Sequence, residues 1–195
     1  MSNYLPQIAE KTPYGYNYTN PFDTLYKDRI IFINDIIDYN VAGNVTSQLL
    51  ALEQKDNKAG ITLYLNSPGG SIDDVFMIAD TINYISCPVH TVCLGQTSGS
   101  ASILLAIGQK RMMLEHARVI LRQPSMGSQR AKSTDIKSYA DELTRLRGKL
   151  EETLTAHSKL SLDEINAFTQ HETVLTADKC LEHGLIDEIL TKRAN

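Results

Sequence analysis

A strand, a glycine turn and a helix follow one another twice in this chain, and this repeated unit constrains the fold more than any other feature. The first unit runs from an apolar strand at 61–65 through Asn66-Ser67-Pro68-Gly69-Gly70 into a helical apolar pattern over 72–82. The second repeats the order over 89–107, with its turn at 95–99. Alternating strands and helices of this kind predict an α/β fold with a mostly parallel sheet.

The remaining elements extend this pattern towards both ends of the chain. Further strands are expected at 30–33, 111–114 and 118–121, and helices at 41–54, 134–157 and after the N-caps Ser161 and Thr176. The helix over 134–157 would be roughly 36 Å long at 1.5 Å per residue, more than one small domain needs to cover its sheet. Part of it is therefore expected to project and to meet another subunit. Residues 1–20 show neither apolar period but are rich in tyrosine, so we interpret them as an arm preceding a single domain over 21–195.

Length and charge exclude several classes of protein. With 195 residues, 42% of them hydrophobic, the chain can bury a core without disulfides or metal. Its 19 Lys and Arg against 23 Asp and Glu give a net charge of −4, which offers no broad positive field for nucleic acid. No apolar run approaches the roughly 20 residues of a membrane span. The first 19 residues carry neither a signal-peptide nor a transit-peptide pattern, so we expect a cytoplasmic protein with no membrane partner.

Cysteine and histidine give no sign of a metal or cofactor site. Cys87, Cys93 and Cys180 are odd in number and none forms a C-x-x-C pair, which favours reduced, buried thiols. No His, Cys or carboxylate cluster has metal-ligand spacing. Neither glycine turn matches a phosphate-binding motif. We therefore predict no cofactor and no metal.

Chemistry is expected at the edge of the sheet where the two glycine turns meet. Turns that follow parallel strands and open helices present free backbone N–H groups, which can hold an oxyanion or a carbonyl oxygen. The second turn, Thr97-Ser98-Gly99-Ser100-Ala101-Ser102, offers several hydroxyls, and none stands out as a nucleophile. Among the histidines only His171, beside Glu172, has the local setting of an acid-base group, although a surface-loop histidine is more often inert.

Several stretches, taken in order, resemble the proteolytic subunit of the Clp protease, ClpP. They are Asn20-Pro21-Phe22-Asp23-Thr24-Leu25, Arg29-Ile30-Ile31-Phe32, Tyr64-Leu65-Asn66-Ser67-Pro68-Gly69-Gly70, Thr91-Val92-Cys93-Leu94-Gly95-Gln96, Gln123-Pro124-Ser125 and Gly184-Leu185-Ile186-Asp187. The resemblance implies a crotonase-like fold, a superhelix of repeated ββα units with a projecting long helix. It also implies seven-membered rings stacked in pairs, ring-to-ring contact through that helix, an axial loop at 1–20, and an AAA+ unfoldase docked on the barrel.

The departures from the family fall on the residues that do its chemistry. The resemblance implies a nucleophilic serine at Gly99, a histidine at Arg122 and an acid at Glu172. A glycine has no hydroxyl and a guanidinium accepts no proton at neutral pH, so this set cannot perform general-base-assisted acyl transfer. The oxyanion donors implied by the family match Gly70 and Ser100. The chain is thus similar to the degenerate ClpR type, which joins mixed rings with active ClpP subunits.

Two alternatives stay open from the sequence alone. The chain could be an active serine peptidase that uses Ser98 or Ser100 with His116 or His171. A crotonase-type acyl-CoA enzyme would instead need an acid-base carboxylate near Gly70 or Ser100, for which Asp73 and Asp74 are the near candidates.

The family also implies a docking cleft for the unfoldase. The matching wall positions are Tyr64 and Tyr84, which we predict to share one face, because tyrosine suits a site that is apolar on one side and wet on the other. A bulky aromatic often found beside Leu50 is Ala51 here, so we expect the unfoldase to dock weakly.

Overall fold

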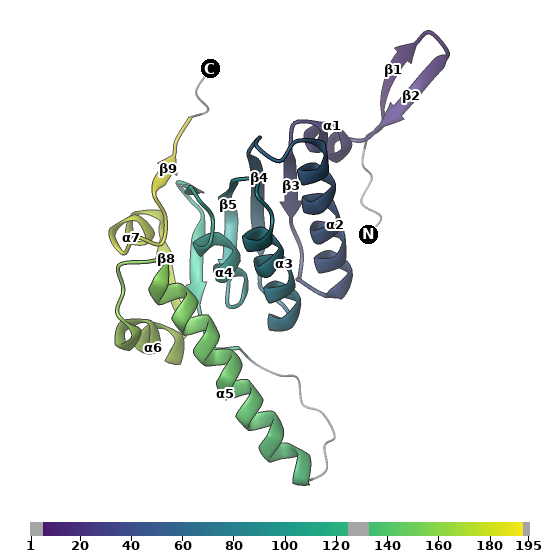
Figure 1. Cartoon of the computed structure of the whole chain (residues 1–195). Coiled ribbons are helices and arrows are strands. Elements are labelled where there is room, and N and C mark those ends of the chain that lie inside the picture. The colour runs from purple at the N-terminus through teal and green to yellow at the C-terminus, as the bar shows by residue number, and fades with distance from the viewer. Residues whose placement is uncertain (1–5, 125–132, 193–195) are drawn as a thin grey trace.

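The computed structural model of the chain describes residues 6–124 and 133–192 (Figure 1). Residues 1–5 of the expected N-terminal arm lie outside the described residues. The part that is described begins with a hairpin, β1 (Ile8–Thr12) paired antiparallel with β2 (Gly15–Thr19), which extends away from the body. These strands were not predicted from the sequence. Both faces of the hairpin are solvent-exposed, and the only alternation is that of Tyr16 and Tyr18 in β2.

A short helix that the sequence analysis missed joins the hairpin to the sheet. Asn20 begins α1 (Pro21–Lys27) with a capping box, in which its side chain accepts from Asp23 N–H and Asp23 accepts from Asn20 N–H. The helix is seven residues long and buries no residue completely, so it leaves little periodic signal.

The main sheet confirms the α/β prediction. Its parallel path runs β3 (Ile30–Ile33), β4 (Ile61–Ser67), β5 (Val89–Ser98), β6 (Arg111–Leu114) and β9 (Glu188–Leu190), while β7 (Arg118–Leu121) pairs parallel with β5 and antiparallel with β8 (Thr173–Thr176). The strand β5 is longer than predicted, since it continues through the expected turn as far as Ser98. That extension pairs with β7 and carries the second glycine turn to the same edge as the first.

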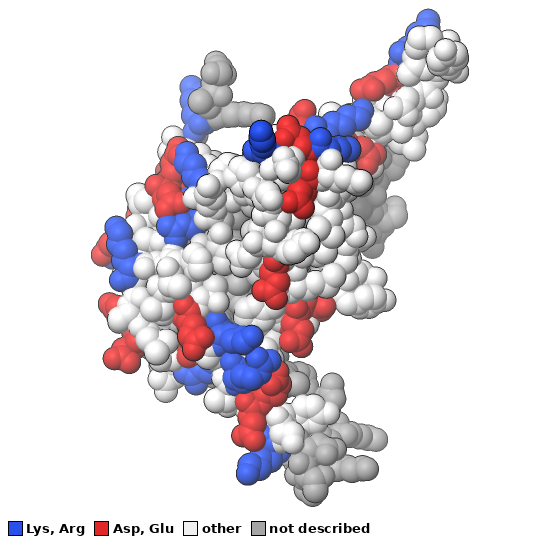
Figure 2. Space-filling model, in the orientation of Figure 1, with Lys and Arg blue, Asp and Glu red and all other residues white. Residues whose placement is uncertain are grey.

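Three helices cover one face of this sheet (Figure 1). They are α2 (Tyr39–Lys55), α3 (Ile72–Tyr84) and α4 (Ala101–Ala106). Strand β4 alternates between buried and half-buried residues, so Leu63 and Leu65 join the core under the helices while Tyr64 points to the other face. On the face shown in Figure 2, Lys and Arg side chains are intermingled with Asp and Glu.

The expected long helix is α5 (Ser133–Ala156), and it projects from the body as predicted (Figure 1). Its second half packs on the core through Leu146, Leu150 and Leu154. In its first half Ile136 and Tyr139 are 59% and 43% exposed. The chain then returns through α6 (Leu162–Gln170) and α7 (Ala177–Glu182), which begin at the predicted N-caps.

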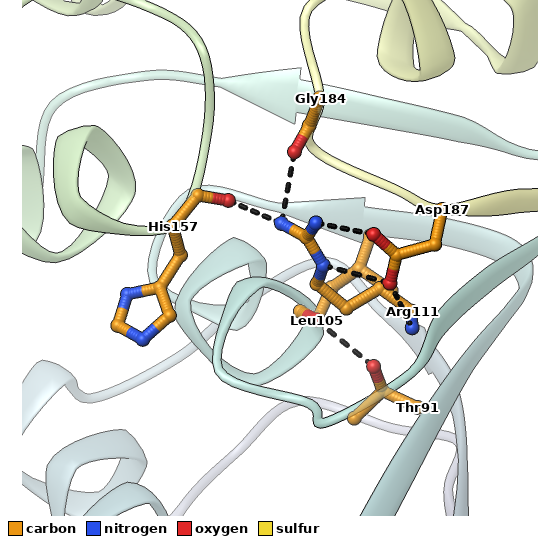
Figure 3. A network of polar contacts seen from close by, with 6 residues as sticks. All are labelled: Thr91, Leu105, Arg111, His157, Gly184 and Asp187. Carbon is orange, nitrogen blue, oxygen red and sulfur yellow. Dashed lines mark hydrogen bonds and ion pairs between the residues drawn. The ribbon is translucent and has the colours of Figure 1, made fainter.

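Arg111 holds the ends of these C-terminal helices together (Figure 3). Its guanidinium donates to both carboxylate oxygens of Asp187, at 3.1 and 2.5 Å, and its backbone N–H donates to the same carboxylate at 2.8 Å. The same guanidinium donates to the carbonyls of His157, just after α5, and of Gly184, just after α7. Arg111 therefore ties together the segments that follow two helices. This partnership lowers the pKa of Asp187, chiefly through the Arg111 hydrogen bonds.

The three thiols are free and buried, as predicted. Burial raises the pKa of Cys93 to about 11 and that of Cys180 to about 12. Both thiols are therefore protonated at neutral pH and serve as small apolar core groups. None of the described helices is long and apolar enough to cross a membrane.

Candidate active site

The two glycine turns meet closely at the carboxyl edge of the sheet. A Cβ atom on Gly69 would lie 2.6 Å from the carbonyl oxygen of Ser98, and one on Gly70 would lie 2.0 Å from the carbonyl oxygen of Ile37. Gly69 and Ser71 exchange backbone hydrogen bonds with Ile37, at 3.0 and 2.9 Å. Only glycine fits at position 70, because the segment before α2 passes directly against it.

Gly99 lies at the sharp bend between β5 and α4. Its φ is +54°, a left-handed conformation that glycine adopts without a steric penalty. Its N–H donates to the carbonyl of Ile120 at 2.8 Å, which continues the pairing of β5 with β7. The bend is thus fixed by the sheet on one side and by the start of α4 on the other.

The three positions implied for the catalytic triad come together around this bend. A Cβ on Gly99 would lie 3.1 Å from Nε of Arg122, so the arginine side chain lies across the place where a nucleophile would stand. Nη2 of Arg122 donates to the carbonyl of Pro68 at 2.9 Å. Its Nη1 lies 3.9 Å from Oε2 of Glu172, and the two side chains are 46% and 58% exposed. The pair is therefore loose and well solvated.

The positions implied for the oxyanion donors also lie together, but the side-chain hydroxyl of Ser100 is bonded to the backbone of Gly70. Gly70 N–H donates to Oγ of Ser100 at 3.1 Å, and the same hydroxyl donates to the carbonyl of Gly70 at 3.1 Å. The sequence analysis missed this contact. Its only signal in the sequence is a hydroxyl residue directly after the glycine of the bend.

No histidine partners the candidate serines in the described part of the chain. Ser98 and Ser100 are each 5% exposed, and the hydroxyl of Ser100 is bonded to Gly70. His116 and His171 are exposed, and neither ring makes a hydrogen bond among the described residues. The geometry thus brings together Gly99, Arg122 and Glu172 rather than a serine and a histidine.

The carboxylates considered for an acyl-CoA enzyme lie elsewhere. Asp73 and Asp74 occupy the first turn of α3, where Asp74 N–H donates to the N-cap Ser71. Asp73 lines a separate cavity of about 300 Å³ between α3 and α5. Among the described residues, no hydrogen bond joins either carboxylate to Gly70 or Ser100, and no group of three His, Cys, Asp or Glu could hold a metal.

Tyr64 lines an apolar groove of about 500 Å³ on the sheet face opposite the helices. Its ring stacks on Phe32 with centroids 5.1 Å apart, and Phe22 packs edge-on against Phe32 at 5.4 Å. Tyr84 does not line this groove: it ends α3 and is 81% exposed. The expectation that the two tyrosines share one face is wrong within a single chain. Strand alternation turns Tyr64 away from the face that α3 covers.

Comparison with known proteins identifies the family of the chain. The family model for Clp protease matches residues 14–193. The chain belongs to the Clp protease family. It is 42% identical over 191 residues to the ATP-dependent Clp protease proteolytic subunit 1 of Bifidobacterium longum, covering 97% of this chain and 82% of that protein. It is 39% identical to proteolytic subunit 2 of Leifsonia xyli, over 97% and 86% of the two chains, and 38% identical to proteolytic subunit 2 of Corynebacterium jeikeium, over 99% and 93%.

Proposed function

We propose that the chain is a subunit of an ATP-dependent Clp protease barrel that has no peptidase activity of its own and acts as a structural or regulatory ring subunit. The observation that carries this proposal is Arg122 lying across Gly99, with Nε 3.1 Å from where a side chain would begin. At the two positions that the family uses for its nucleophile and its base, Gly99 supplies no hydroxyl and Arg122 accepts no proton.

The chemistry of acyl transfer explains why glycine at position 99 and arginine at position 122 argue against peptidase activity. Peptide hydrolysis of this type needs a hydroxyl oxygen, a base to take its proton and an acid to orient the base. Gly99 supplies no hydroxyl, and the guanidinium of Arg122 stays charged. Glu172 can pair with Arg122 but has no imidazole to orient.

The two other functions receive less support. Peptidase activity through Ser98 or Ser100 would need a histidine within hydrogen-bond reach, and both serines are buried without one among the described residues. An acyl-CoA reaction would need a carboxylate at the two donors, and Asp73 faces a different cavity.

Assembly into heptameric rings, pure or mixed with an active paralogue and stacked into a tetradecamer, is part of the proposal. Three surfaces support it: the apolar groove at Tyr64, the exposed Ile136 and Tyr139 of α5, and the hairpin, which has no core of its own. A two-stranded hairpin alone is marginally stable in water. We assign α5 to ring-to-ring contact, residues 1–20 to the axial entrance, and the assembly to the cytoplasm.

The AAA+ unfoldase is proposed to dock in the groove at Tyr64, with Tyr84 reaching a groove only from a neighbouring subunit. Ala51 lies on α2, on the other face of the sheet, so it too would reach a groove only from a neighbouring subunit. There it leaves less apolar area for docking than an aromatic residue would. At about 25 cal/mol per Å², a lost aromatic contact costs on the order of 1 to 2 kcal/mol, roughly ten-fold in affinity. In a mixed barrel the active ring would therefore recruit the unfoldase preferentially.

The first experiment measures peptidase activity of the purified chain. We expect no labelling by a fluorophosphonate and no cleavage of a small fluorogenic peptide. Labelling or cleavage that disappears in Ser98→Ala or Ser100→Ala would contradict the proposal and would identify the serine responsible.

The second experiment addresses assembly and docking. Light scattering with and without an active paralogue is expected to give ring-sized masses, and a strictly monomeric mass in both would contradict the proposal. Unfoldase binding is then compared between rings of this chain and rings of the paralogue. Equal or tighter binding to rings of this chain, unaffected by Tyr64→Ala, would overturn the docking assignment.

A further inference from the structure

The backbone of Gly70 is exposed to solvent, yet its N–H is not free. It donates to Oγ of Ser100 at 3.1 Å, and the Gly70 carbonyl accepts from the same hydroxyl at 3.1 Å. Ser100 itself is 5% exposed. A buried side chain thus satisfies both polar groups of an exposed glycine thirty residues earlier in the chain.

The bridge to Ile37 explains why Gly70 offers both groups on the same side. In this parallel bridge Ile37 bonds to the residues on either side of Gly70, donating to Gly69 O and accepting from Ser71 N–H. The N–H and C=O of Gly70 therefore point away from Ile37. An extended peptide or a carbonyl oxygen approaching this edge would meet these two groups first, and the Ser100 hydroxyl already occupies them.

This contact differs from ordinary helix capping. A serine at the start of a helix usually accepts from an N–H of its own first turn. Ser100 precedes α4 but makes no such bond with it. The nearby Ser102 hydroxyl, in contrast, bonds within the bend, donating to the carbonyl of Gly99 at 2.6 Å. Ser100 is directed across the site, and Ser102 is not.

We propose that Ser100 is an internal ligand of Gly70. The Ser100 hydroxyl occupies the backbone N–H of Gly70 that an acyl substrate would use. This inference rests on the proposed function, because it treats the two glycine turns as a former acyl site. Ser100 is then a positioning residue. It closes the site independently of Gly99 and Arg122, so restoring the triad positions alone would leave the donor occupied.

Competition for the donor follows from hydrogen-bond chemistry. A developing oxyanion is a stronger acceptor than a neutral hydroxyl and can displace it. Displacement leaves the buried Ser100 hydroxyl without its partner, which carries a cost each time the site opens. Removing the hydroxyl removes that cost.

The direct test is amide hydrogen exchange at Gly70 in the assembled chain, resolved to single residues by mass spectrometry. Because Gly70 is exposed, Ser100→Ala is expected to speed exchange of its amide by about ten-fold or more. Ser102→Ala is the matched control and is expected to leave Gly70 unchanged. Unchanged exchange of the β5 amides shows that each variant remains folded. A Gly70 amide that exchanges freely in the parent chain, or equally in parent and Ser100→Ala, would overturn the inference.

A second test restores the implied nucleophile and base with Gly99→Ser and Arg122→His. We expect fluorophosphonate labelling of this double variant to quicken by roughly ten-fold or more when Ser100→Ala is added, since one oxyanion donor is worth about 100- to 1,000-fold in rate. Adding Ser102→Ala instead should leave the rate unchanged. An equal rate with and without the Ser100 hydroxyl, including no labelling in either, would overturn the inference. Activity in the unmodified chain would contradict the proposed function but would leave the exchange result standing.

Discussion

Two arginines of this chain have opposite relations to the fold. The Arg111 side chain is 16% exposed, bonds the carbonyls that follow two helices and pairs with Asp187 through both carboxylate oxygens. Arg122 is 46% exposed, makes one hydrogen bond, to a carbonyl, among the described residues, and lies 3.9 Å from its acidic neighbour. An arginine side chain thus holds several segments together at position 111, whereas at position 122 it only lies over a turn. Charge type alone does not reveal which role an arginine has; the number of fixed acceptors around it does.

Removing the less exposed arginine should have the largest effect. Arg111→Ala is expected to lower the free energy of unfolding by about 2 to 3 kcal/mol, because Asp187 and the carbonyls of His157 and Gly184 lose their donor. Denaturant unfolding measures this loss. Lys110→Ala is the matched control, since Lys110 pairs with Glu188 only on the surface, and should change stability by less than about 0.5 kcal/mol. A similar small change for Arg111→Ala would remove the contrast between the two arginines.

Filling the space under Arg122 should have the next largest effect. Gly99→Ala places a Cβ on a residue with φ of +54° and is expected to cost about 1 to 2 kcal/mol. Adding Arg122→Ala relieves the crowding at Nε but leaves the backbone strain, so most of the loss should remain. Gly43→Ala on α2 is the control, because no atom lies within 4 Å of its Cβ, and it should stabilise by about 0.5 to 1 kcal/mol. Full recovery on adding Arg122→Ala would show that the arginine, not the bend, limits position 99.

Acid should weaken the stabilisation that the Arg111–Asp187 pair provides. Arg111 lowers the pKa of Asp187 in the folded chain, so this stabilisation is present above the unfolded value of about 3.9 and is lost as pH falls through the lower folded value. The melting temperature of Asp187→Asn should therefore lie below that of the parent chain at pH 7, and the gap should narrow below about pH 4. A gap that stays constant between pH 7 and pH 3 would contradict this account.

The exposed arginine should matter least to stability. Arg122→Ala is expected to change the free energy of unfolding by about 0.5 kcal/mol or less, because its ion pair with Glu172 is long and solvated. The same denaturant measurement as for Arg111→Ala makes the comparison direct. A loss as large as that of Arg111→Ala would mean that Arg122 supports the turn at Pro68 rather than merely covering it.

Elements with strong apolar periods could be predicted from the sequence, and elements fixed by pairing could not. The strands at 30–33, 111–114 and 118–121 and the helix α5 appear where expected, within a residue or so. The hairpin, α1, β8 and β9 were missed, since each is short and is determined by its partner strand or its cap rather than by its own pattern.

The site divides in the same way. Motif order indicated that Gly99, Arg122 and Glu172 belong together, and they do lie together. The contact between Ser100 and Gly70 depends on a separation of 3.1 Å between two turns, which no spacing rule encodes. Tyr64 and Tyr84 were wrongly predicted to share one face. Tyr64 points from β4 to the open face of the sheet, whereas Tyr84 lies at the end of α3, which covers the other face.

The left-handed bend at Gly99 also has an evolutionary consequence. A side chain held there for catalysis must be strained, and replacing it by glycine releases that strain. Under the proposed function, in which a partner ring carries out hydrolysis, a glycine at this bend would relieve the strain without removing hydrolysis from the assembly. Reversal requires a destabilising step before any activity returns. Under the proposed function, such a step would be easier to take than to reverse, and the subunit would depend on active partners for hydrolysis.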